Sequence, residues 1–170
     1  QAGGFCEGEY LKVISCKTAS LFKCCCACAV YTAGGTEDIL EKFVNFGEYA
    51  GICFQIKDDI FDYFSNDVGK PTGSDMREGK ITLPALYVLE NSGNPLLHSI
   101  REKLAAGEIL GEKEIETLIR VSVEEGGIEY ATTKIEHYRQ LALESIPETI
   151  DDEFRDALVA YIDYVISRKK

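Results

Sequence analysis

Apolar side chains recur every three or four residues through almost the whole of this 170-residue chain. This spacing places them on one face of an α-helix, whereas a half-buried strand would carry an apolar residue at every second position. Residues 8–32 illustrate the pattern, with an expected stripe of Leu11, Ile14, Thr18, Leu21, Cys25 and Cys28. The sequence therefore predicts an all-α fold, with helices long enough to form a helical bundle.

Glycine, proline and asparagine mark the ends of the expected helices. The predicted helices cover residues 8–32, 37–64, 84–90, 94–106, 112–125, 127–146 and 150–168, and residues 65–81 form a long polar loop. Gly47 and Gly51 lie inside the second helix, where each costs ~1 kcal/mol relative to alanine. We therefore expect a neighbouring helix or a ligand to approach the backbone closely at these two positions.

The chain is acidic, with 18 basic residues against 29 acidic ones and a net charge of −11. Residues 108–156 hold most of the excess, 14 acidic residues against five basic ones. We expect this region to form a solvated outer layer of helices. Because no basic stripe is available to neutralise phosphates, the composition argues against a nucleic acid as partner.

Seven cysteines are present, and four of them lie between Cys24 and Cys28. Such a cluster does not resemble a spaced disulfide framework. Cys24 and Cys28 are one helical turn apart, but a metal site would need two more soft ligands, and the two histidines, His98 and His137, are distant in the sequence. We therefore expect small buried core residues, in a reducing, cytoplasmic compartment.

The longest unbroken apolar run, from Cys24 to Tyr31, is much shorter than the ~18–20 residues that a membrane-spanning helix needs. We therefore expect no membrane span. The chain begins at Gln1, and its only methionine is Met76. From this we expect an incomplete reading frame.

Three aspartates, Asp58, Asp59 and Asp62, lie near the end of the predicted helix 37–64. Their spacing places the three carboxylates on one helix edge, with Gln55 about one turn earlier. Two unit charges ~5 Å apart repel by ~3 kcal/mol at an effective dielectric of ~20, and the helix dipole is negative there as well. A divalent cation such as Mg²⁺ would remove both penalties, since it binds a few carboxylates together with phosphate oxygens. A solvated acidic helix end is the simpler alternative.

The polar loop that follows contains two lysines in glycine-flanked positions, Lys70 and Lys80. A carboxylate edge followed by such a loop suits a metal-chelated diphosphate that also contacts cationic side chains. Taken singly, each lysine is more simply a surface residue. Lys17, which precedes Thr18 in the otherwise apolar first helix, either extends to solvent or faces a polar cavity.

Taken in order, these motifs resemble the C-terminal half of the trans-isoprenyl (polyprenyl, farnesyl or geranylgeranyl) diphosphate synthases. The matching pieces are Tyr10-Leu11, Lys17-Thr18, Phe54-Gln55-Ile56, the DDxxD motif of Asp58, Asp59 and Asp62, Gly69-Lys70-Pro71, and Gly79-Lys80 with Thr82-Leu83-Pro84. The resemblance implies a helical bundle of the isoprenoid synthase type. Residues 1–170 would be the C-terminal portion of that single domain, with the motif-bearing helices and loop in 8–84 and outer helices in 85–170.

The resemblance also implies a chain-elongating prenyltransferase. Such an enzyme ionises an allylic diphosphate with the help of Mg²⁺, adds isopentenyl diphosphate to the cation, and then loses a proton. Asp58, supported by Asp59 and Asp62, would hold Mg²⁺ on the allylic diphosphate. The diphosphate would contact Lys17, Lys70 and Lys80. Thr18 and Gln55 would face the allylic cation with their oxygens, and Phe54 would contact isopentenyl diphosphate.

The family's first aspartate-rich motif and its paired arginines are not among the 170 residues. We therefore expect this chain to be inactive by itself and the full-length parent, a homodimer as is usual in the family, to be active. The alternative is a non-catalytic partner subunit or a diphosphate-binding module of a prenyl synthase. A terpene cyclase is disfavoured, because Lys80 and Thr82-Leu83-Pro84 match the chain-elongating enzymes.

Overall fold

Helices are the regular elements throughout the part of the chain that the structure, a computed structural model, describes, which is residues 6–64 and 72–169. They are α1 (Glu7–Ile14), η1 (Ser15–Ala19), α2 (Ser20–Thr32), α3 (Glu37–Phe61), α4 (Ser74–Arg77), α5 (Leu83–Asn91), η2 (Pro95–Leu97), α6 (His98–Ala105), α7 (Glu112–Glu124), α8 (Gly127–Glu144) and α9 (Asp152–Ser167). The predicted all-α class is confirmed. The predicted helix ends agree with the observed ones to within a few residues, but the short helix α4 lies within the predicted loop 65–81 and was not predicted.

The chain divides into two compact units. The first unit contains the described residues of 1–10 and 58–132, and the second contains residues 11–57 and 133–169. The long helix α3 supplies residues to both, because the division falls between Lys57 and Asp58.

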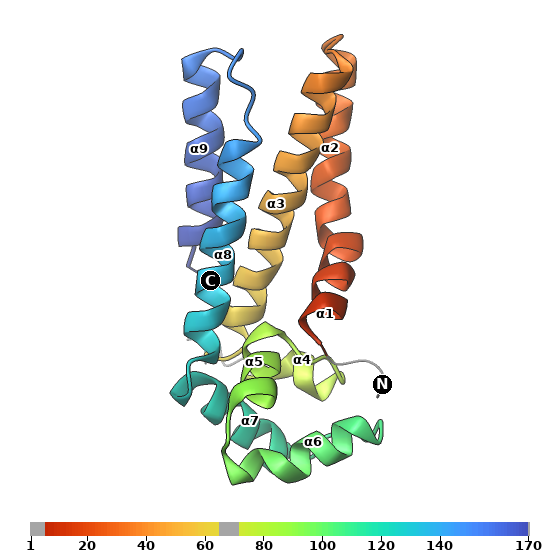
Figure 1. The fold of residues 1–170 in the computed structure, drawn as a ribbon, viewed down its shortest axis with the longest axis vertical. Helices are drawn as coiled ribbons and strands as arrows, with labels where there is room; N and C mark the ends of the chain where they lie inside the picture. Colours follow the sequence, from red (N-terminus) through yellow and green to blue (C-terminus); the bar gives the residue numbers. More distant parts are fainter. Residues whose placement is uncertain (1–5, 65–71, 170) are drawn as a thin grey trace. The chain divides into compact units, whose positions relative to one another are not determined.

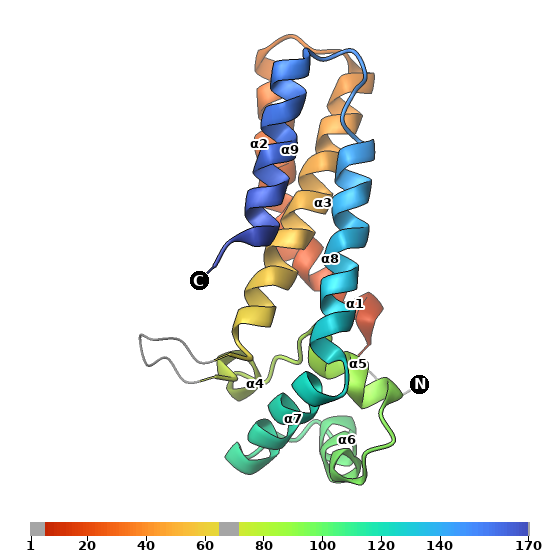
Figure 2. The same ribbon diagram turned by 90° about the vertical axis from the view of Figure 1, so that its left-hand side faces the viewer.

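Four long helices, α2, α3, α8 and α9, lie side by side in the second unit (Figures 1 and 2). The core between them is formed by fully buried apolar residues, among them Ala50, Cys53, Ile56, Ala142 and Ile162. Every long helix of this unit thus directs one apolar face inward, as the helical spacing in the sequence predicts.

The two glycines inside α3 allow close contact with the preceding helical segment. A Cβ atom on Gly51 would lie 2.5 Å from the Cα atom of Ala19, and one on Gly47 would lie 2.9 Å from the carbonyl oxygen of Phe22. Both neighbours are backbone atoms that cannot move aside without shifting a helix. The prediction of close helix approach at Gly47 and Gly51 is therefore confirmed.

The π-helix η1 was not predicted from the sequence. A π-helical turn takes in about one residue more than an α-helical turn, so the residues after it are rotated relative to the 3.6-residue pattern. The fully buried residue at this point is Ala19 rather than Thr18, and one turn later Phe22 is half-buried while Leu21 is 66% exposed. The buried stripe predicted for residues 8–32 is therefore wrong by one position beyond η1.

The register shift also corrects the prediction of buried cysteines. Cys24, Cys25 and Cys28 are exposed on α2, and all seven cysteines are free thiols. Cys53 is buried, and its Sγ lies 3.4 Å from the carbonyl oxygen of Ile135, to which it donates. Burial raises the pKa of the Cys53 thiol to about 12.

The first unit is built around α5, which carries buried residues on all of its faces: Leu83, Pro84, Ala85, Leu86 and Val88. Helix α7 packs against α5 and α4, and the rings of Tyr87 and Tyr130 stack with their centroids 4.4 Å apart. The Arg101 guanidinium donates to the carbonyl oxygens at the end of α5, at 2.6 Å to Leu89 and 2.5 Å to Ser92. This side chain satisfies carbonyl groups that the helix itself leaves unpaired.

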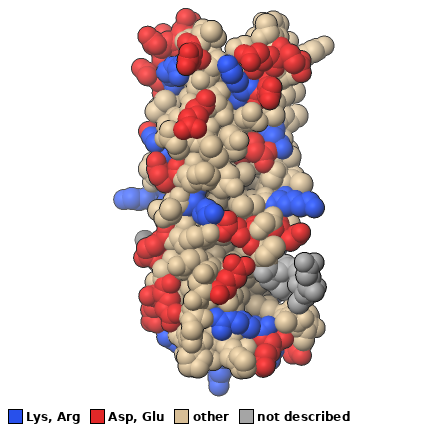
Figure 3. All heavy atoms as spheres, in the orientation of Figure 1, with Lys and Arg blue, Asp and Glu red and all other residues tan. Residues whose placement is uncertain are grey.

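Acidic side chains spread along the helices on the face drawn in Figure 3. Of the 14 acidic residues in 108–156, all except the half-buried Glu114 are exposed. Glu114 pairs with Lys103 at 2.7 Å, and Glu112 pairs with Arg77 at 2.8 Å. The expected solvated acidic layer is confirmed.

Within the described residues, Glu7–Thr32 is the one helical stretch long and apolar enough to cross a membrane, at 26 residues. One such stretch is weak support for a membrane span, because the core helix of a soluble protein has the same length and composition. Its packing against Gly47 and Gly51 of α3 shows that part of its surface contacts protein. The absence of a span stays a prediction.

The contact between Gly51 and Ala19 can be tested by substitution. We expect Gly51→Ala to destabilise the protein by about 1–3 kcal/mol, because the added methyl overlaps the backbone of Ala19. Gly8→Ala on α1 is the matched control, since a Cβ there meets nothing within 4 Å and should stabilise the helix by about 0.5–1 kcal/mol. Urea unfolding of both variants measures the effects. A Gly51→Ala protein as stable as the wild type would contradict the packing described.

Candidate active site

The predicted carboxylate cluster lies at the end of α3, but its three members differ in their surroundings. Helix α3 ends at Phe61, so Asp58 and Asp59 are helical and Asp62 is the first residue beyond the helix. Asp59 is 5% exposed, whereas Asp58 and Asp62 are half-buried. The three carboxylates therefore differ in exposure, and their shared role as metal ligands stays a prediction.

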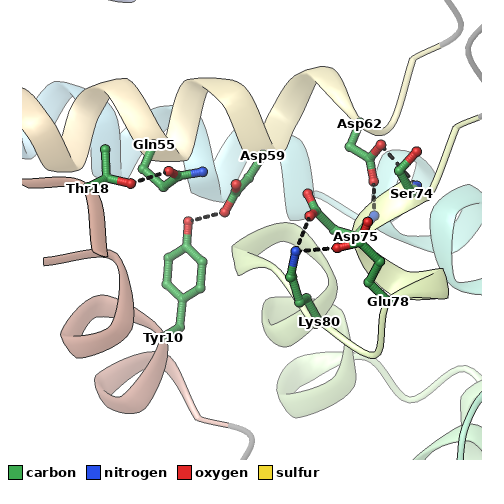
Figure 4. A network of polar contacts seen from close by, with 9 residues as sticks. All are labelled: Tyr10, Thr18, Gln55, Asp59, Asp62, Ser74, Asp75, Glu78 and Lys80. Atoms are coloured by element: carbon green, nitrogen blue, oxygen red, sulfur yellow. Dashed lines mark hydrogen bonds and ion pairs between the residues drawn. The ribbon is translucent and has the colours of Figure 1, made fainter. Parts of the chain in front are cut away.

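Asp59 is held by a tyrosine from the start of the chain. The Tyr10 hydroxyl donates to Asp59 Oδ2 at 2.7 Å, and both residues are buried (Figure 4). Burial raises the pKa of Tyr10 well above its ordinary value, and the negative charge of Asp59 raises it further. The phenol therefore stays protonated and remains a donor. Tyr10 is part of the Tyr10-Leu11 motif that resembles the family, but it lies 49 residues before Asp59, and the sequence did not predict their contact.

Asp62 connects the end of α3 to the start of α4. Its Oδ1 accepts the backbone N–H of Ser74 and its Oδ2 accepts that of Asp75, each at 3.0 Å. The Asp62 carbonyl oxygen also accepts the N–H of Gly73 at 2.8 Å. Gly73 has φ +77°, and a Cβ there would lie 2.7 Å from Ile119, so glycine is required. Asp62 thus satisfies free N–H groups at the first turn of α4.

Lys80 follows α4 and is surrounded by carboxylates. Its Nζ donates to Glu78 and lies 3.6 Å from Asp75 Oδ1, and its backbone N–H donates to the Asp75 carbonyl oxygen at 2.9 Å (Figure 4). The hydrogen bond to Glu78 is the main cause of the raised pKa of Lys80. The ammonium group is therefore charged. Lys70, the other lysine predicted in this loop, lies outside the described residues.

Two of the predicted catalytic residues contact each other in the second unit. The Thr18 hydroxyl donates to Gln55 Oε1 at 2.6 Å, joining η1 to α3. Lys17, also in η1, is exposed. A π-helical segment is often found at functional sites. Here the segment contains both residues of the Lys17-Thr18 motif.

Phe54 lies among aromatic and cationic groups. Its ring centroid is 5.5 Å from that of Phe22, and the Arg168 guanidinium lies over the ring, 4.0 Å from the centroid. Arg168 also donates to the Phe54 carbonyl oxygen at 3.0 Å. The two residues are 114 positions apart in the sequence, so this contact was not predicted.

In 6–64 and 72–169, no group of three or more His, Cys, Asp or Glu side chains is arranged to hold a metal ion. Mg²⁺ in enzymes that act on phosphates is usually held by one or two carboxylates together with phosphate oxygens and water. Asp58, which is half-buried next to Asp59 on α3, supplies a hard oxygen ligand of the kind such a site needs.

Comparison with known proteins gives a family for this arrangement. Residues 2–119 match the polyprenyl synthetase family. The chain belongs to this family. The octaprenyl diphosphate synthase of Haemophilus influenzae is 33% identical over 157 residues, which are 91% of this chain and 47% of that protein.

Two solved structures extend the comparison. The crystal structure of the geranylgeranyl pyrophosphate synthase from Bacteroides thetaiotaomicron matches 97% of this chain and 55% of that one, with a TM-score of 0.86 and 43% identity. A polyprenyl synthase from Caulobacter crescentus CB15, complexed with calcium and isoprenyl diphosphate, has a TM-score of 0.85 and 27% identity over 97% of this chain and 51% of that one. The isoprenoid synthase type of fold is confirmed. The chain spans about half the length of these relatives.

The hydrogen bond between Tyr10 and Asp59 generates a prediction about stability. Tyr10→Phe should cost about 1–3 kcal/mol, because a buried carboxylate loses a donor. The pKa of Tyr10 in the folded protein lies above the unfolded value of about 10. Protonated Tyr10 therefore stabilises the folded protein fully below pH ~10, and this stabilisation is lost as the pH rises further. Urea unfolding at pH 8 and pH 10.5 should show a smaller alkaline loss in Tyr10→Phe than in the wild type.

Tyr31→Phe provides the control, because Tyr31 is 82% exposed on the second unit. Its stability should equal that of the wild type at both pH values. If Tyr10→Phe also behaved like the wild type, the hydrogen bond to Asp59 would contribute nothing to folding.

The role of Asp62 at the start of α4 can be tested without metal or substrate. Asp62→Ala removes acceptors for two backbone N–H groups and should destabilise the protein by about 1–2 kcal/mol. Hydrogen exchange followed by mass spectrometry should show faster exchange in residues 73–79. Asp38→Ala is the control, since exposed Asp38 makes only a surface pair with Lys42 at 3.3 Å. Unchanged exchange in Asp62→Ala, measured in metal-free buffer, would refute this positioning role.

Proposed function

We propose that the protein to which these residues belong is a chain-elongating trans-prenyltransferase. It would condense an allylic diphosphate with isopentenyl diphosphate, with Mg²⁺ as cofactor, as a cytoplasmic homodimer. The observation that carries the proposal lies on α3, where Gln55, hydrogen-bonded to Thr18, precedes Asp58 and Asp59 by about one helical turn. The amide oxygen of Gln55, which can stabilise a positive charge, thus belongs to the helical turn before two carboxylates that suit a metal-bound diphosphate.

The diphosphate end of the substrate requires positive charge. Mg²⁺, when bound, would offset the charge of the leaving diphosphate and be held by Asp58. Lys80 offers a charged ammonium group at the end of α4, and Asp62 holds the backbone that positions it. Lys17, exposed on η1, would give a second cationic contact, and Lys70 a third.

The hydrocarbon end develops positive charge when the allylic bond breaks. Thr18 donates its only hydroxyl proton to Gln55, which leaves the Thr18 oxygen lone pairs available and orients the Gln55 amide. Oxygen dipoles held in this way stabilise a nearby cation without having to reorganise during the reaction. Phe54 would contact isopentenyl diphosphate, beside the Arg168 guanidinium that lies on its ring.

The assigned metal ligand can be tested in the full-length protein. Asp58→Ala should lower turnover by orders of magnitude, because the leaving diphosphate loses the carboxylate that holds its metal ion. Incorporation of radiolabelled isopentenyl diphosphate measures turnover, and circular dichroism checks that the helices are intact. Asp156→Ala, an exposed carboxylate near the start of α9, should retain full turnover. Wild-type turnover in Asp58→Ala would show that Asp58 is not the ligand.

The 170-residue chain should not elongate substrates by itself. The relatives are about twice as long, and the family's first aspartate-rich motif is not among these residues. Incubation of the chain with Mg²⁺, an allylic diphosphate and isopentenyl diphosphate should therefore give no longer product. Appreciable elongation would contradict this, whereas a full-length protein that folds without elongating would favour the partner-subunit alternative.

A further inference from the structure

Four of the seven cysteines lie within one short stretch of α2, and the proposed function uses none of them. Cys24, Cys25 and Cys28 are exposed there, and Cys26 is half-buried. Cys25 and Cys26 line an apolar groove of about 430 Å³ in the second unit, together with residues of α3 and α9. Cys24 and Cys28 do not line this groove. The cluster is thus divided into two pairs with different surroundings.

Cys24 and Cys28 are four residues apart on a continuous α-helix. Cβ atoms at this spacing are about 5–6 Å apart, whereas a disulfide needs them at about 3.5–4.5 Å. A disulfide between these two residues would therefore require α2 to distort.

A bound ion fits this spacing better than a sulfur–sulfur bond does. At a thiolate–metal distance of about 2.3 Å, two sulfurs on one ion lie between about 3.8 Å in a tetrahedral arrangement and about 4.6 Å in a linear one. Side chains whose Cβ atoms are about 5–6 Å apart reach such a separation without bending the helix. The pair is thus spaced for an atom inserted between the two sulfurs.

We propose that Cys24 and Cys28 form a two-sulfur binding site for a thiophilic monovalent cation, Cu(I). Thiolate ligands favour Cu(I), and structural zinc needs four protein ligands. In the described part of the chain no third His, Cys, Asp or Glu completes a metal-binding group. Binding exchanges two S–H bonds for two Cu–S bonds and releases two protons to solvent, with no change in the oxidation state of sulfur or copper.

A side-chain hydrogen bond closes the last turn of α2. The Thr32 hydroxyl donates to the carbonyl oxygens of Cys28 and Ala29 at 2.8 and 3.0 Å, which closes the last turn. Gly34, with φ +71°, ends the segment. Cys28 therefore lies in a regular turn, and its position relative to Cys24 is fixed by the helix rather than by a loop.

The test is an anaerobic titration of the purified protein with Cu(I), in competition with a coloured Cu(I) chelator. Wild-type protein should bind one Cu(I) with high affinity. Cys24→Ser and Cys28→Ser should each weaken this binding by about 100-fold or more. In each variant only one sulfur of the pair remains, so the ion loses the second sulfur that the helix holds at a high effective concentration. Circular dichroism of each variant confirms that its helix content is unchanged.

Two double variants serve as matched controls. Cys6→Ser with Cys16→Ser removes two exposed thiols that are ten residues apart, and it should leave the affinity unchanged. Cys25→Ser with Cys26→Ser removes the thiols that line the apolar groove and should leave it unchanged as well. The proposal is overturned if wild-type protein competes no better than Cys24→Ser, or if loss of Cys25 rather than Cys24 abolishes binding.

Discussion

The close contact between α3 and the segment before it brings together the two elements that carry the candidate residues of the second unit. Gly51 has no side chain, so the backbone of Ala19 can lie against α3. Thr18 precedes Ala19, and Gln55 lies one turn beyond Gly51, so the same contact brings Thr18 within 2.6 Å of Gln55. Stability and the candidate site thus depend on one packing constraint, and a larger residue at position 51 would disturb both.

The carboxylates at the end of α3 show how hydrogen bonds within a protein can reduce the repulsion between like charges. Asp59 receives a proton donor from Tyr10, and Asp62 leaves the helix to accept N–H groups of α4. These contacts offset the repulsion that the sequence spacing implies. Under the proposed function, Asp58 would hold Mg²⁺ with the support of Asp59 and Asp62, whose carboxylates these contacts orient.

Helix positions could be predicted from the sequence because the apolar spacing and the glycine and proline breaks are local signals. The π-helix η1 could not, because one extra residue in a turn leaves no mark in composition, and the stripe beyond it was misplaced for that reason. Contacts between distant residues were also missed, such as Tyr10 with Asp59 and Arg168 with Phe54. In each case both residues were visible in the sequence, but only folding places them together.

The acidity of the chain bears on how a diphosphate could bind. Lys80 is charged, but Asp75 and Glu78 lie beside it and cancel much of its positive potential. With a net charge of −11, the rest of this 170-residue chain supplies no compensating positive field. Under the proposed function, the lysines orient the diphosphate, whereas most of the charge compensation has to come from a divalent cation. Nearby carboxylates that order Lys80 therefore make the reaction more dependent on metal.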